Sequence, residues 1–300
     1  MERVEQPQIS AVLPTLGRPT LVHAVESALQ QEGVRVEAVV SVDGDKDLAR
    51  SVRTQLPSEC DVVWTGGAGL NAARNLGIRE STQTWVGLLD DDDTWDPRKT
   101  VTQLAMVNEG ESDVLLASAV RTVPEAGPGQ VRPKRGPRPG EPVADYLFRR
   151  RSLTDFKNGL MPSTWLAPRP LFVENPFDEA DFSRHDDWAW LVTTQARHPF
   201  EVRLALEPLV LYRVLGADSA SRKTKARASR AWIGSMDEYI SPAARVDFML
   251  TAVNFLALSS GGRAEAWTAF REALPSVRPQ NSLAALAAMY RMARGQRPPR

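Results

Sequence analysis

The sequence predicts an α/β protein with a doubly wound, mostly parallel sheet and a helical extension at its carboxyl end. Short apolar, β-branched runs alternate with helical patterns through the first 120 residues, an order typical of parallel strands joined by crossover helices. The runs are almost continuously apolar, which suits strands covered on both faces. From Lys223 onward, apolar residues recur at helical spacing instead.

Five apolar runs predict the strands of this sheet: Ile9 to Leu13, Val36 to Val42, Val62 to Thr65, Trp85 to Leu89 and Val114 to Ala119. The helix after the first strand carries Leu21, Val25 and Leu29 on one face, so we expect it to pack on the sheet. Two further helices are expected over Leu70 to Glu80 and Pro97 to Glu109, the second of which follows the favourable capping residue Asp96.

The segment from Pro124 to Pro142 interrupts this alternation, with six prolines, four glycines and no apolar periodicity. We expect a surface loop there. Its basic residues could close over an anionic substrate, although a solvated insertion is the simpler interpretation. Helices are expected over Val246 to Ser259, Arg263 to Ala273 and Ser282 to Arg294. These patterns predict a sheet domain over residues 1–221, with halves at about 8–120 and 143–221, and a helical extension over 222–300.

Composition limits the class of protein. The 300 residues include 42% apolar ones, enough for a substantial core and about two domains. The formal net charge is zero, but from Arg222 to Arg300 there are 13 Lys and Arg against 5 Asp and Glu. This basic third suits a solvated helical surface or contact with an anionic membrane; we expect no nucleic-acid partner.

Cysteine and hydropathy patterns bear on location. Cys60 is the one cysteine, which excludes an internal disulfide and fits a reducing compartment. The first residues, MERVEQPQIS, lack the apolar stretch of a signal peptide, and no apolar run approaches the roughly 18 residues of a spanning helix. We therefore expect a cytoplasmic protein, with peripheral contact at the inner face of the membrane as an alternative.

Four consecutive aspartates, Asp90 to Asp93, directly follow a predicted strand in VGLLDDDDTW. Ligands of open α/β sheets bind beyond the carboxyl ends of strands, and a cation would relieve the repulsion among these carboxylates. Asp90 and Asp92 converge if the chain stays extended, whereas a turn would present Asp91 with Asp92. Hard oxygen ligands suit Mg²⁺ or Mn²⁺, often shared with substrate phosphates. The alternative, an acidic start to the helix at Pro97, needs only one carboxylate.

Two other segments support a nucleotide site. Asp43 lies at the end of another predicted strand, just before Gly44, and two such strand ends form a crevice. GGAGLNAARN, from Gly66 to Asn75, places glycines before a helix, where backbone amides could approach a phosphate. It lacks the spacing of a P-loop or of the dinucleotide-binding fingerprint.

A second acidic cluster occurs in NPFDEADFSRHDDWAWL, close to Trp188 and Trp190. A carboxylate beside aromatic rings could act as a base, and the tryptophans could stack on a sugar or belong to the core. A metal site at His185 with Asp186 and Asp187 is disfavoured, because no second histidine stands at ligand spacing.

Five ordered segments together resemble the family 2 glycosyltransferases of the GT-A fold: ISAVLPTLGRPTLVHAVESALQQ, SVDGD, LNAARNLGI, VGLLDDDDTWDPRK and FDEADFSRHDDWAW. The resemblance runs from about Gln8 to Arg213 and leaves the last third without a match. It implies a hexosyltransferase-type enzyme that takes a nucleoside-diphosphate-sugar donor, with UDP-sugar the first choice, and a divalent cation, Mn²⁺ or Mg²⁺. It also implies inversion by direct displacement onto a saccharide, lipid-linked or small-molecule acceptor.

The resemblance further implies roles on the donor side. Five residues are expected at the nucleotide sugar: Thr15, Asp43, Arg74, Asp90 and Asp91. Thr15 and Asp43 would face the base and ribose, and Arg74 would lie near the nucleotide. Asp92, with Asp90, would hold the cation.

On the acceptor side, Asp187 matches the family's general base. Five residues are expected near the acceptor: Ser163, Thr164, Trp165, Asp186 and Trp188. The chemistry agrees, because a sugar hydroxyl is a poor nucleophile and the leaving diphosphate gains negative charge. A proton acceptor and a cation on opposite sides meet both needs.

Two positions depart from the family pattern. Many relatives have two acids before the glycine where this chain has Val42 and Asp43, and many carry a histidine where this chain has Leu215. Asp218, or the diphosphate with water, could complete the shell of the cation.

Three other classes compete with this interpretation. Asp90 to Thr94 also satisfies the D-x-D-x-T pattern of haloacid-dehalogenase-like phosphatases, with Asp90 as nucleophile. A nucleotidyltransferase would need more basic residues than the single Arg18 of LPTLGRPT. A noncatalytic nucleotide- or carbohydrate-binding module is the third. For the last helix, a shared face of Leu283, Leu286, Tyr290 and Ala293 suggests homodimerisation or membrane contact, with packing on the catalytic domain as the alternative.

Overall fold

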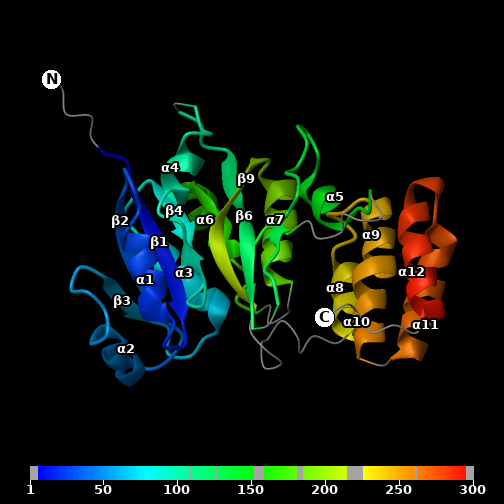
Figure 1. Ribbon diagram of the computed structural model, residues 1–300, viewed down its shortest axis with the longest axis horizontal. Coiled ribbons are helices and arrows are strands. Elements are labelled where there is room, and N and C mark those ends of the chain that lie inside the picture. The colour runs from blue at the N-terminus through cyan, green and yellow to red at the C-terminus, as the bar shows by residue number, and fades with distance from the viewer. Residues whose placement is uncertain are drawn as a thin grey trace. The chain divides into compact units, whose positions relative to one another are not determined.

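The computed structural model describes residues 6–108, 110–125, 127–151, 159–180, 185–214, 226–260 and 262–294. The chain forms two compact units (Figure 1). We call Met1–Gly136, Gly159–Phe182 and Pro199–Leu215 the sheet unit, and Pro137–Asn158, Ser183–His198 and Gly216–Arg300 the helical unit. No helix in the described part of the chain is both long and apolar enough to cross a membrane.

The sheet unit is built on nine strands among the described residues, in the order β3-β2-β1-β4-β8-β6-β9-β5, with β7 paired to β6. The strands are β1 (Gln8–Thr15), β2 (Arg35–Val42), β3 (Asp61–Trp64), β4 (Trp85–Leu88), β5 (Thr94–Trp95), β6 (Val114–Pro124), β7 (Val131–Arg132), β8 (Leu166–Pro168) and β9 (Glu201–Val214). Strands β3, β2, β1 and β4 are parallel, as predicted.

The rest of the sheet is mixed, which the sequence analysis did not predict. β8 runs antiparallel to both β4 and β6, whereas β6 and β9 pair in parallel along most of their length. β7 lies inside the proline-rich segment that was expected to be only a loop. Such short strands lack a periodicity long enough to recognise.

Five α-helices and one 3₁₀ turn complete the described sheet unit: α1 (Leu21–Leu29), α2 (Lys46–Arg53), α3 (Leu70–Glu80), α4 (Lys99–Leu104), η1 (Pro162–Thr164) and α6 (Arg169–Glu174). The bounds of α3 are those predicted. α4 is shorter than predicted, because the amides of Met106 and Val107 bond three residues back and end the helix as a turn.

Close packing sets the core of this unit. α1 buries Leu21, Ala24, Val25 and Ala28 against the sheet. α3 approaches β1 so closely that a Cβ on Gly77 would lie 2.5 Å from a methyl carbon of a β1 valine. The predicted coverage of apolar strands by helices is therefore confirmed for β1, whose inner residues are fully buried.

The helical unit contains α5 (Val143–Phe148), α7 (Asp186–Arg197), α8 (Ala226–Ser235), α9 (Pro242–Phe248), η3 (Met249–Val253), α10 (Asn254–Ser259), α11 (Arg263–Ala273), η4 (Leu274–Ser276), η5 (Pro279–Asn281) and α12 (Ser282–Arg294). The bounds of α11 and α12 match the prediction. The predicted Val246-to-Ser259 helix is divided among α9, a π-helical turn and α10.

Contacts divide the chain differently from the predicted boundary after residue 221. α5 and α7, which were expected with the sheet, belong to the helical unit. The reason is a buried carboxylate: Asp247 of α9 accepts hydrogen bonds from the Arg149 side chain and the Arg150 amide, both at 2.9 Å. The ring of Phe148 also packs edge-on against Trp188 and Trp232.

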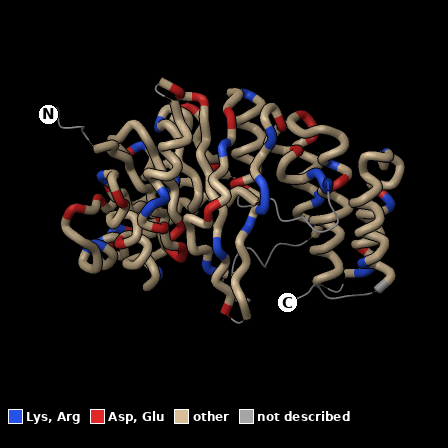
Figure 2. The backbone as a smooth tube through the Cα atoms, turned by 45° about the horizontal axis from the view of Figure 1, so that its top comes forward, with Lys and Arg blue, Asp and Glu red and all other residues tan. Residues whose placement is uncertain are grey.

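The basic residues in the described part of the helical unit do not form one block. In Figure 2 they are interleaved with acidic residues over the helices. Arg230 pairs with Glu272 at 3.2 Å, and Arg245 pairs with Asp237 at 2.8 Å. These pairs suit the solvated surface that was the simpler expectation from composition.

Candidate functional site

Asp90, Asp91, Asp92 and Asp93 form a tight turn at the carboxyl end of β4, which we call the acidic turn. The amide of Leu89 still bonds to the Val12 carbonyl of β1 at 3.0 Å, so the strand pairing extends to the residue before the turn. The amide of Asp93 then bonds back to the Asp90 carbonyl at 3.1 Å. A closed turn sends successive side chains in different directions.

Asp91 and Asp93 point into the protein. Asp91 is 3% exposed and accepts hydrogen bonds from Thr15 Oγ1 at 2.5 Å and from Arg18 Nη1 at 2.8 Å. Asp93 is 1% exposed and accepts from Ser163 Oγ at 2.6 Å and from the Arg213 amide at 2.9 Å. These two carboxylates tie the turn to other strands and are satisfied by the protein itself.

Asp90 and Asp92 remain accessible. The side chain of Asp90 is 30% exposed and that of Asp92 is 17% exposed. Asp90 Oδ1 lies 3.1 Å from Arg74 Nη2, and Asp92 Oδ2 lies 3.2 Å from Arg18 Nη1. The accessible pair is therefore Asp90 and Asp92, which was the pair expected for an extended chain, although the four residues form a turn.

Burial in the turn disfavours the ionised form of two of its carboxylates. Burial, reinforced by the neighbouring charge of Asp90 and opposed by Arg18, raises the pKa of Asp92 from 3.8 to about 6. Burial and the same neighbour also raise the pKa of Asp93 well above its ordinary value. A cation bound at the turn would reverse this penalty on the ionised carboxylates.

The donor atoms suit a cation that is shared with a substrate. Among the described residues, no group of three His, Cys, Asp or Glu side chains converges to form a complete metal site. Mg²⁺ is commonly held by one or two carboxylates together with substrate phosphates and water. Asp92 with Asp90 fits that pattern, and Asp91 and Asp93 do not, because their oxygens are occupied.

Thr15 and Asp43 lie at the same edge of the sheet as the acidic turn. β1 pairs in parallel with both β2 and β4, and the Asp43 amide bonds to the Thr15 carbonyl at 2.8 Å. Oδ1 of Asp43 accepts from Thr65 Oγ1 at 3.0 Å and from the Gly69 amide at 2.9 Å. No described residue bonds to its other oxygen, which leaves an acceptor beside the crevice.

The glycine-rich segment before α3 is organised by the protein rather than left open for a phosphate. Gly66, Gly67 and Gly69 all have positive φ, which glycine adopts readily. The Gly69 amide bonds to Asp43, and the Gly67 and Ala68 amides lie 3.3 Å from Thr65 Oγ1. These amides already have partners, so the segment positions Asp43.

Arg74 is carried into the site by α3. It is 3% exposed, its guanidinium reaches Asp90, and its Cζ lies 5.4 Å from the ring centroid of Phe177. The side chain of Asn75 holds the backbone of Phe177 in place, because it donates to the Phe177 carbonyl and accepts from the Phe177 amide, both at 2.9 Å. Arg74 is thus a buried counterion of the acidic turn.

The expected acceptor contacts Ser163, Thr164 and Trp165 are each 0% exposed. Ser163 supports the turn: its hydroxyl donates to Asp93 and accepts from the Asp90 amide at 3.2 Å. Trp165 stacks on Phe177 with 6.3 Å between ring centroids. These side chains present no surface to an acceptor here, because they pack beneath the turn.

Asp186 and Asp187 begin α7 in the helical unit, where both are partly buried. Asp187 Oδ1 accepts from the Trp188 amide at 2.8 Å. Trp188 stacks on His185 with 4.9 Å between ring centroids, and His185 lies 2.8 Å from Ser229 Oγ. His185 is thus enclosed by aromatic and hydroxyl groups. Leu215 and Asp218 lie outside the described residues.

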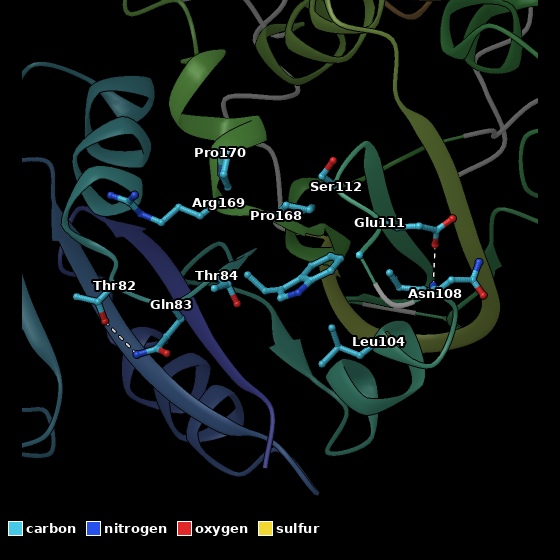
Figure 3. A pocket seen from close by; sticks show the side chains of 13 residues that line it. Thr82, Gln83, Thr84, Leu104, Asn108, Glu111, Ser112, Pro168, Arg169 and Pro170 are labelled. Carbon is cyan, nitrogen blue, oxygen red and sulfur yellow. Dashed lines mark hydrogen bonds between the residues drawn. The ribbon is translucent and has the colours of Figure 1, made fainter. Parts of the chain in front are cut away.

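A separate cleft of about 650 Å³ lies at the opposite, amino-terminal end of β4 (Figure 3). Thr82, Gln83 and Thr84 line one side, and Asn108 and Glu111 line another. Its one carboxylate is already bound by Arg203 at 2.7 Å. Since the cleft lacks a cluster of free charges, the acidic turn remains the candidate site.

Sequence reasoning did not predict that three residues organise the acidic turn, and it expected one of them, Ser163, near the acceptor instead. Arg18, Ser163 and Asp93 each bond to a partner at least 70 positions away. The position of Arg18 just beyond a predicted strand was the one available signal, because strand ends of a parallel sheet meet at one edge.

Comparisons with known proteins agree with this geometry. The profile described as "Glycosyl transferase family 2" matches residues 10–168 of the 300. The succinoglycan biosynthesis protein ExoO of Rhizobium meliloti is 39% identical over 80 residues, which are 26% of this chain and 23% of that protein. The match therefore spans less than a quarter of that relative's length.

Solved structures share the fold over nearly the whole chain. S. aureus TarS 1–349 in complex with UDP-GlcNAc has a TM-score of 0.59 at 14% identity, covering 97% of this chain and 89% of that one. The Pyrobaculum calidifontis mannosyltransferase PcManGT, in complex with GDP-Man and Mn²⁺, has a TM-score of 0.55 at 14% identity, covering 97% and 88%. The fold is that of GT-A enzymes, and with more than half of its length matched by the family profile, the chain belongs to the family 2 glycosyltransferases.

Proposed function

We propose that this glycosyltransferase moves a sugar from a nucleoside-diphosphate donor to an acceptor hydroxyl with inversion, using a divalent cation at Asp92 and Asp90. The observation that carries the proposal is the acidic turn, with its two accessible carboxylates at the sheet edge that also holds Thr15 and Asp43. Family membership favours sugar transfer over the phosphatase, nucleotidyltransferase and noncatalytic alternatives.

A UDP-sugar is the first donor to test, because the TarS structure of this fold contains UDP-GlcNAc. The PcManGT structure contains GDP-Man with Mn²⁺, which supports a cation as well. Asp43, whose second oxygen has no described partner, would accept a hydrogen bond from the ribose or base. Thr15 would act indirectly, since its hydroxyl is committed to Asp91.

Asp187 is the proposed general base. It would take the proton of the acceptor hydroxyl as the oxygen bonds to the anomeric carbon and the bond from that carbon to the diphosphate breaks. The cation, when bound, supplies charge neutralisation for the leaving diphosphate. Arg74, buried against Asp90, keeps that carboxylate oriented.

The proposed acceptor is a saccharide, either free or lipid-linked, with a small molecule as the other class. The biosynthetic role in the name of the Rhizobium relative supports polysaccharide assembly. The proposed location is the cytoplasm. Leu286 and Tyr290 of α12 are 53% and 54% exposed, which keeps homodimerisation or peripheral membrane contact as a proposal for this helix.

The first test is thermal unfolding with UDP, GDP, CDP or dTDP, each with and without Mn²⁺. A ligand at 100 times its dissociation constant adds about 2.7 kcal/mol to the free energy of unfolding. We expect one nucleotide to stabilise the protein only with Mn²⁺, and Asp92→Ala to abolish the effect. The matched control is Asp47→Ala, on the exposed surface of α2. If no nucleotide stabilised the protein, the proposal that this site binds the donor would be refuted.

A further inference from the structure

Arg18 occupies the part of the acidic turn that faces solvent. A single nitrogen, Nη1, lies 2.8 Å from Asp91 Oδ1 and 3.2 Å from Asp92 Oδ2. The side chain of Arg18 is 45% exposed, so it reaches these carboxylates from outside. One cationic group therefore bridges two neighbouring aspartates.

We infer that Arg18 is a built-in counterion that competes directly with the divalent cation for Asp92. The inference rests on the proposed function, in which Asp92 holds that cation. Mg²⁺ binds oxygen at about 2.0–2.1 Å, far closer than the 3.2 Å between Arg18 and the same carboxylate. Positive charges beside the same carboxylate repel each other, so cation binding at Asp92 is weakened while Arg18 stays there and strengthened once its side chain moves away.

The local structure permits this exchange without unfolding the turn. Gly17 has a φ of 78°, and its amide bonds to Thr15 Oγ1 at 2.8 Å, which anchors the backbone just before Arg18. Only the long, half-exposed side chain of Arg18 has to swing. The bond from the Thr15 hydroxyl to Asp91 does not involve Arg18, so this movement does not require breaking it.

Arg74 shows the contrasting arrangement. It is 3% exposed, and it contacts Asp90 from within the protein while its guanidinium faces Phe177. Departure of Arg74 would leave a buried cation without its carboxylate, which is costly. The turn therefore has one permanent counterion, Arg74, and one exchangeable counterion, Arg18.

The test measures Mn²⁺ binding without any nucleotide, by electron paramagnetic resonance of free Mn²⁺ at pH 8. Arg18→Ala should bind Mn²⁺ at least about tenfold more tightly than the unaltered chain, because a unit charge a few Å from the ion is removed. Arg18→Lys keeps the charge and should lie closer to the unaltered chain. The matched control is Arg50→Ala on α2, which removes an exposed arginine whose partner among the described residues is Asp47, and it should leave Mn²⁺ binding unchanged.

Unchanged or weaker Mn²⁺ binding by Arg18→Ala would overturn the inference, provided that its thermal unfolding shows a folded protein. Asp92→Ala added to Arg18→Ala should erase the gain, and persistence of the gain would place the ion elsewhere and also overturn it. Failure of the proposed function is distinguishable, because it would appear as no stabilisation by any nucleotide with Mn²⁺. If a nucleotide stabilised the protein with Mn²⁺ but Arg18→Ala did not change Mn²⁺ binding, only the competition between Arg18 and the cation would be refuted.

Discussion

Replacing Asp92 with asparagine should stabilise the protein at pH 8 when no divalent cation is present. The ionised carboxylate is held in a half-enclosed position beside Asp90, and Arg18 compensates for this only in part. Asparagine keeps the shape of the side chain and removes the charge. A site built for a cation is expected to cost stability when the cation is absent.

The magnitude follows from the rise of the Asp92 pKa from 3.8 to about 6. At about 1.36 kcal/mol per pKa unit, this rise corresponds to at most about 3 kcal/mol. Because the folded-state pKa is raised, the contribution of Asp92 to stability is fully present below pH 3.8 and is lost as pH rises through about 6. The advantage of Asp92→Asn should therefore develop between about pH 4 and pH 6 and stay constant above.

Urea unfolding of both proteins at pH 4.5 and pH 8, followed by tryptophan fluorescence, measures this difference. Mn²⁺ should stabilise the unaltered chain at pH 8 and leave Asp92→Asn unaffected. Asp47→Asn is the matched control, since Asp47 is 83% exposed and such substitutions usually change stability by less than about 0.5 kcal/mol. An Asp92→Asn protein that is no more stable than the unaltered chain at pH 8 would refute the reasoning.

Three further predictions concern packing and catalysis. Ser163→Ala should lower the free energy of unfolding by about 1–3 kcal/mol, because the buried carboxyl of Asp93 loses a hydrogen-bond partner. Ser118→Ala removes a buried hydroxyl without a described partner and should lower it less. Equal losses of stability in urea titrations would contradict this account. Gly77→Ala should destabilise by about 1–3 kcal/mol through the clash with β1, whereas Gly234→Ala, with open space around it in α8, should be neutral or stabilising. Asp187→Asn should lower kcat by about 10²- to 10⁴-fold while nucleotide stabilisation with Mn²⁺ stays intact, and parallel loss of both would assign Asp187 to the donor site instead.

The sequence by itself determined the parallel half of the sheet and the place of the acidic turn. Apolar runs of the right length located β1, β2, β3 and β4. The predicted bounds of α3, Leu70 to Glu80, are those of the structure. These features are local, since strand and helix periodicities are readable within a few residues. The order and spacing of five sequence segments were enough to indicate the family, which the profile match then confirmed.

The tertiary structure alone decided which of the four aspartates are available. The two carboxylate oxygens of Asp93 accept hydrogen bonds from Ser163, 70 positions away, and from the Arg213 amide, 120 positions away. Asp91 is likewise committed to Thr15, 76 positions earlier. Four consecutive aspartates in a sequence do not reveal these partners, because hydrogen bonds between residues so far apart form only once distant strands have paired. The same reason explains why α7, with Asp187, belongs to the helical unit, because Trp188 of α7 packs against Trp232 and Phe248, which follow it far along the chain.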